Sequence, residues 1–358
     1  MTFFASAPAP ARTSATPSPT RGQFRCTVLA NVPLCRDHFR LVLGVPAFPP
    51  TEPGVFIQVT CHAPDKITTA REDHPLPWRD DALLQLAPDA ADPLVTRQAF
   101  LRRPFSLAGR RDTAAEVELD VIHRVVGVGT DYLSRLSVGD PVDILGPLGN
   151  RFTLPPPGAT AILVGGGVGI PPMLYLAETL ARAGRAGVAF CGALSRDLLP
   201  LSIIDDDRPP DPESFAPRPN IAEFATRHIP SVITTDDGSY GFRGFVTQAL
   251  ERFLDGGGVV ESRGGGVKRV ASSVPPSTIY TCGPEPMMKR VAGIAAARGL
   301  ECQVAVERAM ACGMGTCQSC CIRVRKPDPS KPPLPGKDWC YRLACTDGPI
   351  FRGADLLW

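Results

Sequence analysis

Residues 162–172 read ILVGGGVGIPP, an apolar run followed by closely spaced glycines and then two prolines. A buried strand, a tight turn and a helix with proline in its first turn produce this order of residues. Glycines between a strand and a helix can hold a phosphate group at the helix N-terminus. The spacing is not G-x-G-x-x-G, because its last position is Ile170, so we predict a nucleotide-phosphate loop of a related but distinct kind. A tight turn without a ligand is the alternative.

The surrounding segment from Phe152 to Ala177 contains no charged residue and is long enough to span a bilayer. The glycines and prolines at its centre favour a strand, a turn and a helix instead, so we expect no membrane span. The whole chain has 38 basic and 36 acidic residues in 358, and no basic block. This balance argues against binding to nucleic acid or to a membrane surface.

On the C-terminal side of the loop, apolar strands alternate with helical patterns, which predicts a parallel α/β domain over residues 157–300. Loop-like insertions interrupt it at about 205–220 and 255–276. Its last strand ends in TCGPEPMM, at the sheet edge where ligands bind in open α/β folds. The predicted nucleotide contacts are Gly165, Gly166, Gly167, Gly169, Cys282, Gly283 and Pro284. Arg196 and Asp197 are candidates for the ribose, and their opposite charges do not distinguish NAD from NADP.

On the N-terminal side, short apolar runs alternate with turn residues over 23–156. FRCTVLANVPL, HFRLVLGVP, GVFIQVTCH, EVELDVIHRVV and DPVDILGPLG are typical of strands and predict a small antiparallel barrel. A Pro- and Asp-rich stretch at about 63–99 is expected to be an insertion. Residues 1–22 contain no acidic residue and are rich in Ala, Ser, Thr and Pro, so we expect a disordered tail, with a transit peptide as the alternative.

The barrel contains the motif R-P-x-S at Arg103, Pro104 and Ser106. A fixed cation, a rigid extended backbone and a hydroxyl could hold a flavin and its phosphates, although an edge strand that ends in a turn would look the same. Further along the chain, Arg124 offers a second cation. Gly129 and Thr130 precede a short helical pattern and could donate hydrogen bonds to a pyrophosphate.

The segment 311–321, ACGMGTCQSCC, places Cys312, Cys317 and Cys320 at C-x4-C-x2-C spacing. This is the plant-type [2Fe–2S] spacing, which needs a fourth cysteine further on, and both Cys340 and Cys345 are candidates. Cys321 could compete with Cys320. A structural zinc site and a nest of buried thiols are alternatives, although zinc usually takes C-x2-C pairs and only one is present.

The C-terminal unit, residues 301–358, is too small to build a large core and would need such a metal centre. The remaining cysteines are scattered singly, which is not a disulfide framework and favours the cytoplasm. They are Cys26, Cys35, Cys61, Cys191, Cys282 and Cys302.

Together these motifs resemble the ferredoxin–NADP reductase superfamily, in which a flavin barrel with R-P-x-S precedes a nucleotide domain with a glycine loop and a C-G-P strand end. Within it, the chain is similar to the electron-transfer subunits of NAD-dependent (class 1B) dihydroorotate dehydrogenases. Three segments carry the closer resemblance: TTDDGSYGFRGFVT (234–247), ERAMACGMGTCQSC (307–320) and ACTDGPIF (344–351). The resemblance extends over about residues 24–358 apart from the insertions, one of which, KPDPSKPPLPGK, lengthens the segment between Cys320 and Cys345.

The resemblance implies a multidomain β plus α/β protein: a flavin-binding β-barrel, a parallel-sheet nucleotide domain and a small C-terminal [2Fe–2S] domain. It implies that the cluster ligands are Cys312, Cys317, Cys320 and Cys345, with Cys345 favoured because it begins C-x-D-G-P. It implies FAD contacts at Arg103, Pro104, Phe105, Ser106, Ile122, His123, Arg124, Gly129 and Thr130.

The same resemblance implies an oxidoreductase subunit that carries no substrate-site residues of its own. An FMN-containing catalytic subunit would oxidise dihydroorotate to orotate in pyrimidine biosynthesis, within a heterotetramer. Electrons would pass through the [2Fe–2S] cluster and FAD to NAD+. The alternative enzyme function is a flavin and iron–sulfur NAD(P)H reductase subunit of a hydrogenase, a sulfide- or ferredoxin-linked complex or an oxygenase. The alternative from a different functional class is a binding module that is stabilised by zinc and has no redox activity.

Overall fold

The computed structural model of the protein describes residues 21–62, 99–204, 212–256, 259–261, 267–269, 276–325 and 338–358. The expected N-terminal tail and the insertion at 63–99 lie almost entirely outside these ranges, as does the KPDPSKPPLPGK segment. The insertions at 205–220 and 255–276 are described in part. No helix among the described residues is long and apolar enough to cross a membrane.

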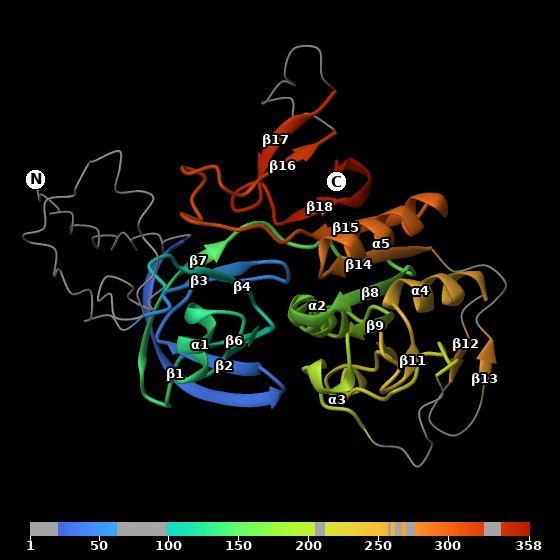
Figure 1. Ribbon diagram of the computed structural model, residues 1–358, viewed down its shortest axis with the longest axis horizontal. Coiled ribbons are helices and arrows are strands. Elements are labelled where there is room, and N and C mark those ends of the chain that lie inside the picture. The colour runs from blue at the N-terminus through green and yellow to red at the C-terminus, as the bar shows by residue number, and fades with distance from the viewer. Residues whose placement is uncertain are drawn as a thin grey trace, which may run out of the picture.

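The N-terminal unit is a seven-stranded antiparallel sheet that curls into a barrel (Figure 1). Its core is formed by side chains such as Val28, Leu41 and Ile57, which are fully buried. After the fourth strand the chain crosses to the far edge of the sheet, where the Ala108 amide donates to the Asp120 carbonyl at 2.8 Å. The strands are β1 (Gly22–Cys35), β2 (His38–Val45), β3 (Phe56–Val59), β4 (Arg103–Ser106), β5 (Gly109–Asp112), β6 (Val117–Arg124) and β7 (Pro141–Leu148).

The strand order is β4-β3-β7-β1-β2-β6-β5, so β4, which carries R-P-x-S, is an edge strand paired to β3. The helix α1 (Val128–Ser134) lies between β6 and β7 in the chain, where a short helix was expected. The five apolar runs that predicted strands all form strands here. The prediction of an antiparallel barrel is therefore confirmed.

The second unit is a seven-stranded sheet of order β11-β10-β9-β8-β14-β15-β18, in which all pairs are parallel except β15 with β18. Helices α4 and α5 pack into one core cluster, and α2 and α3 pack into another. The strands are β8 (Thr160–Gly166), β9 (Gly187–Ala193), β10 (Ser231–Thr235), β11 (Phe242–Arg243), β14 (Ser277–Cys282), β15 (Glu301–Ala305) and β18 (Ile350–Arg352). The helices are α2 (Ile170–Arg182), α3 (Ala222–Ala225), α4 (Val246–Asp255) and α5 (Glu285–Ala297).

The quoted stretch at 162–172 forms the end of β8, a 3-10 turn at Gly167–Gly169 and the start of α2, as its residue order predicted. The segment IAEFATR, which is ambiguous by pattern, forms only the single turn of α3. Part of the insertion at 255–276 forms a small hairpin of β12 (Val259–Glu261) and β13 (Val267–Arg269).

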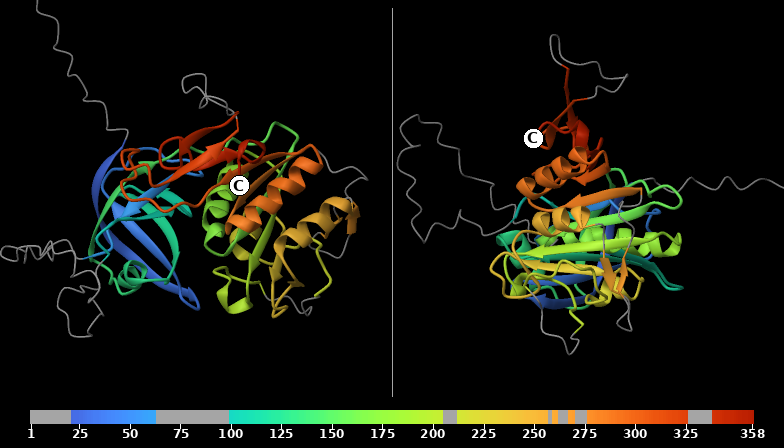
Figure 2. Two further views of the ribbon diagram at one scale, coloured as in Figure 1. Left: turned by 45° about the horizontal axis from the view of Figure 1, so that its top comes forward. Right: turned by 90° about the vertical axis from the view of Figure 1, so that its right-hand side faces the viewer.

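The C-terminal unit is less separate than the cysteine content predicted. Glu301–Ala305, expected at its start, is strand β15 of the large sheet and pairs in parallel with β14. Near the other end, β18 returns to pair with β15. Figure 1 and Figure 2 show the red C-terminal segment lying across both larger units. We propose that the cysteine-rich unit begins after Ala305; its own sheet is the hairpin of β16 (Cys321–Val324) and β17 (Cys340–Leu343).

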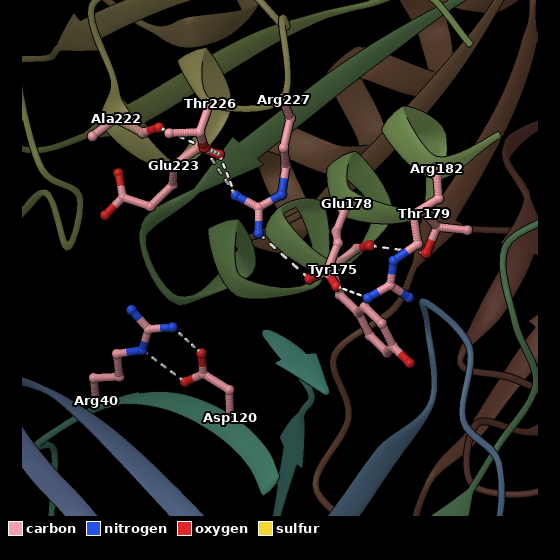
Figure 3. A network of polar contacts seen from close by, with 10 residues as sticks. All are labelled: Arg40, Asp120, Tyr175, Glu178, Thr179, Arg182, Ala222, Glu223, Thr226 and Arg227. Atoms are coloured by element: carbon pink, nitrogen blue, oxygen red, sulfur yellow. Dashed lines mark hydrogen bonds and ion pairs between the residues drawn. The ribbon is translucent and has the colours of Figure 1, made fainter. Parts of the chain in front are cut away.

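Helix α2 lies between the parallel sheet and the barrel (Figure 2). The Tyr175 hydroxyl of α2 donates to the Thr51 carbonyl of the barrel unit at 2.8 Å. Figure 3 shows Glu178 of α2 between Arg182 and Arg227, with which it forms ion pairs. The Arg40–Asp120 ion pair, which joins β2 to β6, faces this network from the barrel (Figure 3). A polar junction therefore sets how the two units meet.

Replacing Gly169 with Ala should destabilise the protein. Gly169 lies at the start of α2 with an ordinary helical conformation, but a Cβ there would overlap the Cys282 carbonyl and lie 2.5 Å from the Gly283 nitrogen. Overpacking against backbone costs about 1–3 kcal/mol. We expect a lower thermal unfolding temperature by calorimetry.

Gly293→Ala is the matched control, because a Cβ at this position in α5 would meet nothing within 4 Å. Alanine in a helix interior should raise stability by about 0.5–1 kcal/mol. Equal unfolding temperatures for the two variants would contradict the close approach of α2 to β14.

Candidate functional site

The cysteine loop, residues 311–320, is shaped by glycines in the left-handed region. Gly313 and Gly315 have φ values of 69° and 87°, which residues with a Cβ adopt only under strain. The loop turns its amides toward sulfur: the Cys312 Sγ accepts hydrogen bonds from the Met314 nitrogen at 3.3 Å and the Cys317 nitrogen at 3.4 Å. Such donors stabilise a thiolate and, with a metal bound, would tune its potential.

The four predicted cluster cysteines come together as two pairs. The Cys317 thiol contacts Ser319 and Cys312, and hydrogen bonds, first from Ser319 and then from Cys312, lower its pKa to about 6. The Cys345 thiol contacts Cys320, and burial, followed by this neighbour, raises its pKa to about 12. The charge of Cys312 also acts on Cys345, so the pairs are close to each other.

Two pairs of thiols fit a two-iron cluster, which is held by four cysteine thiolates. A structural zinc ion needs four ligands around one point. Four thiols in two pairs are the donor set that the iron–sulfur prediction requires.

The hairpin of β16 and β17 separates the candidates for the fourth ligand. Cys321 pairs with Leu343, and Cys340 pairs with Val324 at the far end of the ladder. Because the strands are antiparallel, the chain beyond Leu343 returns toward Cys320, and Cys345 lies there. The Cys321 side chain is exposed, whereas Cys320 and Cys345 share one buried cluster.

The C-x-D-G-P motif forms the turn that holds Cys345. The Asp347 carboxylate accepts a hydrogen bond from the Leu343 nitrogen at 2.8 Å. Asn150, which follows β7, donates to the Asp347 carbonyl at 3.1 Å and accepts from the Ile350 nitrogen at 2.8 Å. Asn150 thus ties the cysteine unit to the barrel, and nothing in its local sequence indicates this role.

The predicted flavin residues lie on β4, β6 and α1, which the barrel brings together. A Cβ on Gly129 would lie 3.5 Å from the Arg103 Cγ, so these two positions are neighbours. The Thr130 hydroxyl accepts a hydrogen bond from the Val126 nitrogen at 2.9 Å and donates to the Gly127 carbonyl at 3.0 Å. These two hydrogen bonds already use the hydroxyl to stabilise the start of α1. Its contact with FAD therefore stays a prediction.

His123 lies between two aromatic rings, Phe39 at 5.8 Å and Phe105 at 6.0 Å. It is buried, and burial lowers its pKa to about 4, so its imidazole is neutral near pH 7. Both its ring nitrogens, and the Nε of Arg124, lack a hydrogen-bond partner in the described part of the protein. Buried polar atoms are normally paired, so these fit a site completed by a bound group such as a flavin.

A cavity of about 800 Å³ lies at the carboxyl ends of the parallel strands. His38 and Arg124 of the barrel also line it, so it adjoins the predicted flavin residues. Of the predicted nucleotide residues, four line it: Gly166, Gly167, Gly283 and Pro284.

Three other predicted nucleotide residues, Gly165, Gly169 and Cys282, are absent from the cavity lining. Gly165 and Gly169 pack against backbone, of Ile170 and Cys282 respectively. The Cys282 thiol packs against the core, and burial, followed by the charge of Glu307, raises its pKa to about 12. Their role as nucleotide contacts stays a prediction.

The ribose candidates Arg196 and Asp197 do not line the cavity. Arg196 stacks over the Tyr240 ring, 5.0 Å from its centre, and Asp197 forms an ion pair with Arg36 of the barrel at 3.2 Å. Sequence reasoning missed Asp236, which does line the cavity directly after β10. The strand-end rule that selected Cys282 would have selected it too. Others missed are His38, Phe245, Thr247, Gln248 and Arg290.

Comparison with known proteins places these features in context. A model of the iron–sulfur cluster binding domain of dihydroorotate dehydrogenase B matches residues 307–357. The electron transfer subunit of dihydroorotate dehydrogenase B (NAD(+)) from Geobacillus thermodenitrificans is 34% identical over 271 residues, 75% of this chain and 82% of the relative. The subunit of the same description from Bacillus caldolyticus is 32% identical over 270 residues, with coverage of 75% and 82%.

Among solved structures, one of an NADH-dependent reduced ferredoxin–NADP oxidoreductase matches with a TM-score of 0.61 and 24% identity. The match covers 93% of this chain and 90% of that chain. At this identity the likeness supports the fold alone, an antiparallel barrel joined to an α/β unit.

Replacing Cys345 with Ser should remove the cluster, whereas Cys340→Ser should leave it in place. Cys345 contacts another predicted ligand, Cys320, whereas Cys340 pairs with Val324 at the far end of the hairpin. We expect loss of iron, acid-labile sulfide and visible absorbance in Cys345→Ser purified without oxygen. A normal cluster spectrum in this variant, with loss in Cys340→Ser, would show that the ligand assignment is wrong.

Proposed function

The chain belongs to the family of electron transfer subunits of dihydroorotate dehydrogenase B, and we propose that it connects an FMN-containing catalytic partner to NAD+. It is an oxidoreductase subunit of pyrimidine biosynthesis that uses a [2Fe–2S] cluster, FAD and NAD, and it works with a catalytic subunit. The partner would oxidise dihydroorotate to orotate on its FMN. The two subunits would form a heterotetramer in the cytoplasm.

This proposal is supported by the adjacency of three predicted sites, for the cluster, the flavin and the nucleotide. At one end, Gly313 of the cysteine loop packs against Gln58 of β3, the strand beside the R-P-x-S strand. At the other end, Arg124 of β6 lines the cavity of the α/β unit. The predicted flavin residues therefore lie between the cluster residues and the nucleotide cavity.

A bound flavin would exchange electrons singly with an iron–sulfur cluster and in pairs with a nicotinamide. The chain's own residues supply the surroundings. The thiols of the cysteine loop and Cys345 would hold the cluster, and the loop amides would stabilise their charge. His123 and Arg124 would complete the flavin site with their unpaired nitrogens, and the cavity would admit the dinucleotide beside them.

Replacing Cys317 with Ser should abolish electron transfer from the partner subunit but leave reduction of the flavin by NADH intact. This side chain is a proposed cluster ligand and does not line the nucleotide cavity. NADH should still bleach the flavin of the variant, but an added FMN-dependent dihydroorotate dehydrogenase should no longer pass electrons from dihydroorotate to NAD+. Stopped-flow absorbance with each donor measures both.

The wild-type chain is the control in the same assay. It should co-purify with such a partner and should support NAD+ reduction by dihydroorotate. Wild-type protein that holds flavin and cluster but neither binds nor accepts electrons from this partner would contradict the proposal and would favour a reductase of another complex.

Asp236 is expected to favour NADH over NADPH. Its carboxylate lines the cavity at the end of β10, where it could accept hydrogen bonds from ribose hydroxyls and would repel a 2′-phosphate. Asp236→Ser should reduce the ratio of kcat/KM for NADH to that for NADPH by about tenfold, which is about 1.4 kcal/mol.

Asp237→Ser is the matched control, because Asp237 is exposed and does not line the cavity. Steady-state reduction of an artificial acceptor measures the ratio for both variants. An unchanged ratio in Asp236→Ser, or the same change in both variants, would rule out this role.

A further inference from the structure

Gln58 lies in β3 on the face that points away from the barrel core. Its neighbours Ile57 and Val59 belong to the barrel core, whereas Phe56 packs in the cluster that contains Cys320 and Cys345. Side chains alternate between the two faces of a strand, so Gln58 shares the face of Phe56. Its side chain is fully buried, at 0% exposure. A polar amide therefore lies between the barrel and the cysteine-rich unit.

The amide of Gln58 has no hydrogen-bond partner, either at Nε2 or at Oε1, among the residues that the structure describes. An unsatisfied buried polar group costs about 1–3 kcal/mol, and native proteins contain few of them. Gln303 of β15 shows the usual arrangement. Its Nε2 donates to the Thr153 carbonyl at 3.0 Å, and its Oε1 accepts from the Thr153 nitrogen at 2.9 Å. Gln58 thus retains hydrogen-bonding capacity that the described protein does not use.

The contacts of Gln58 place it between the two predicted cofactor sites. Across the strand pair it lies directly opposite Pro104 of the R-P-x-S motif. On its other side is the cysteine loop: a Cβ on Gly313 would lie 2.6 Å from the Gln58 Oε1 and 3.1 Å from its Nε2. A side chain at position 313 would displace the amide, so glycine is needed there for this contact as well as for its φ of 69°.

We propose that Gln58 is a tuning residue for the cluster, and that its Nε2 donates a hydrogen bond to the iron–sulfur group held by the cysteine loop. Pro104 lacks an N–H, and its ring side chain has no polar atom. The residue opposite Gln58 therefore does not explain why an amide is buried there. The loop residue in contact with it is next to Cys312, a proposed ligand. Hydrogen bonds to cluster sulfurs favour the more negative, reduced form and so raise the reduction potential. This inference rests on the proposed function, because it requires the cluster.

The test compares Gln58→Met with Gln303→Met in holoprotein purified without oxygen. Methionine keeps an unbranched side chain of similar length but has no N–H donor. In Gln58→Met, the ratio of reduced to oxidised cluster at a fixed potential should fall about tenfold, a downward shift of about 59 mV for a one-electron couple. Potentiometric titration followed by electron paramagnetic resonance measures the cluster, and flavin absorbance in the same titration measures FAD.

In Gln303→Met, the cluster midpoint should stay unchanged while the unfolding temperature falls, because this variant removes the acceptor of the Thr153 nitrogen. The Thr153 carbonyl keeps the hydrogen bond from the Tyr280 hydroxyl. If Gln58→Met fails to retain iron, Gln58→Leu is titrated instead, because leucine is uncharged and has no N–H or O–H donor; the same downward shift is expected.

Three outcomes would overturn this inference. They are an unchanged cluster midpoint potential in Gln58→Met, a shift of the flavin midpoint potential alone, and an equal shift of the cluster midpoint potential in Gln303→Met. Each of these outcomes leaves the proposed function intact. If wild-type protein purified without oxygen contained neither iron nor acid-labile sulfide, this result would instead contradict the proposed function itself.

Discussion

The position of the cysteine loop depends on the two strand pairings of β15, which is parallel to β14 on one side and antiparallel to β18 on the other. β15 leads into the loop, and β18 follows the turn that holds Cys345, so both ends of the cysteine-rich segment are hydrogen-bonded into the sheet of the α/β unit. The segment is too small to bury a core of its own. Many of its buried residues, including Cys320 and Cys345, instead belong to a cluster shared with β8, α4 and α5.

The junction of the barrel with the α/β unit creates the remaining sites. Polar links such as Tyr175 to Thr51 and Arg36 to Asp197 join the two units. With the units in this relation, His38 and Arg124 of the barrel line a cavity whose other walls include the strand ends of the parallel sheet and residues of α4 and α5. Neither unit alone contains this cavity, because residues from both line it.

Buried polar side chains differ in whether the described protein supplies their hydrogen-bond partners. Gln303 and Tyr280 are buried and have backbone partners, and they lie at the seam between the units. His123, Arg124 and Gln58 are also at or near this seam but keep unpaired nitrogens. An unpaired buried polar group destabilises the folded chain, so the unpaired nitrogens of His123, Arg124 and Gln58, beside the predicted cofactor sites, suit these residues to a bound group.

Local patterns in the sequence determined the elements and the chemistry. The alternation of apolar runs predicted the barrel strands, the order strand–glycine–proline predicted the start of α2, and the spacing of Cys312, Cys317 and Cys320 predicted a cluster. These patterns involve residues that are close together in the sequence, so they can be recognised without knowledge of the fold. The tertiary structure decided what is long-range: that Glu301–Ala305 joins the parallel sheet, that Asn150 anchors the turn before Ile350, and that Asp236 rather than Asp197 lines the cavity. Strand pairing and side-chain packing join residues far apart in the chain, and no local pattern records which distant partner a residue will meet.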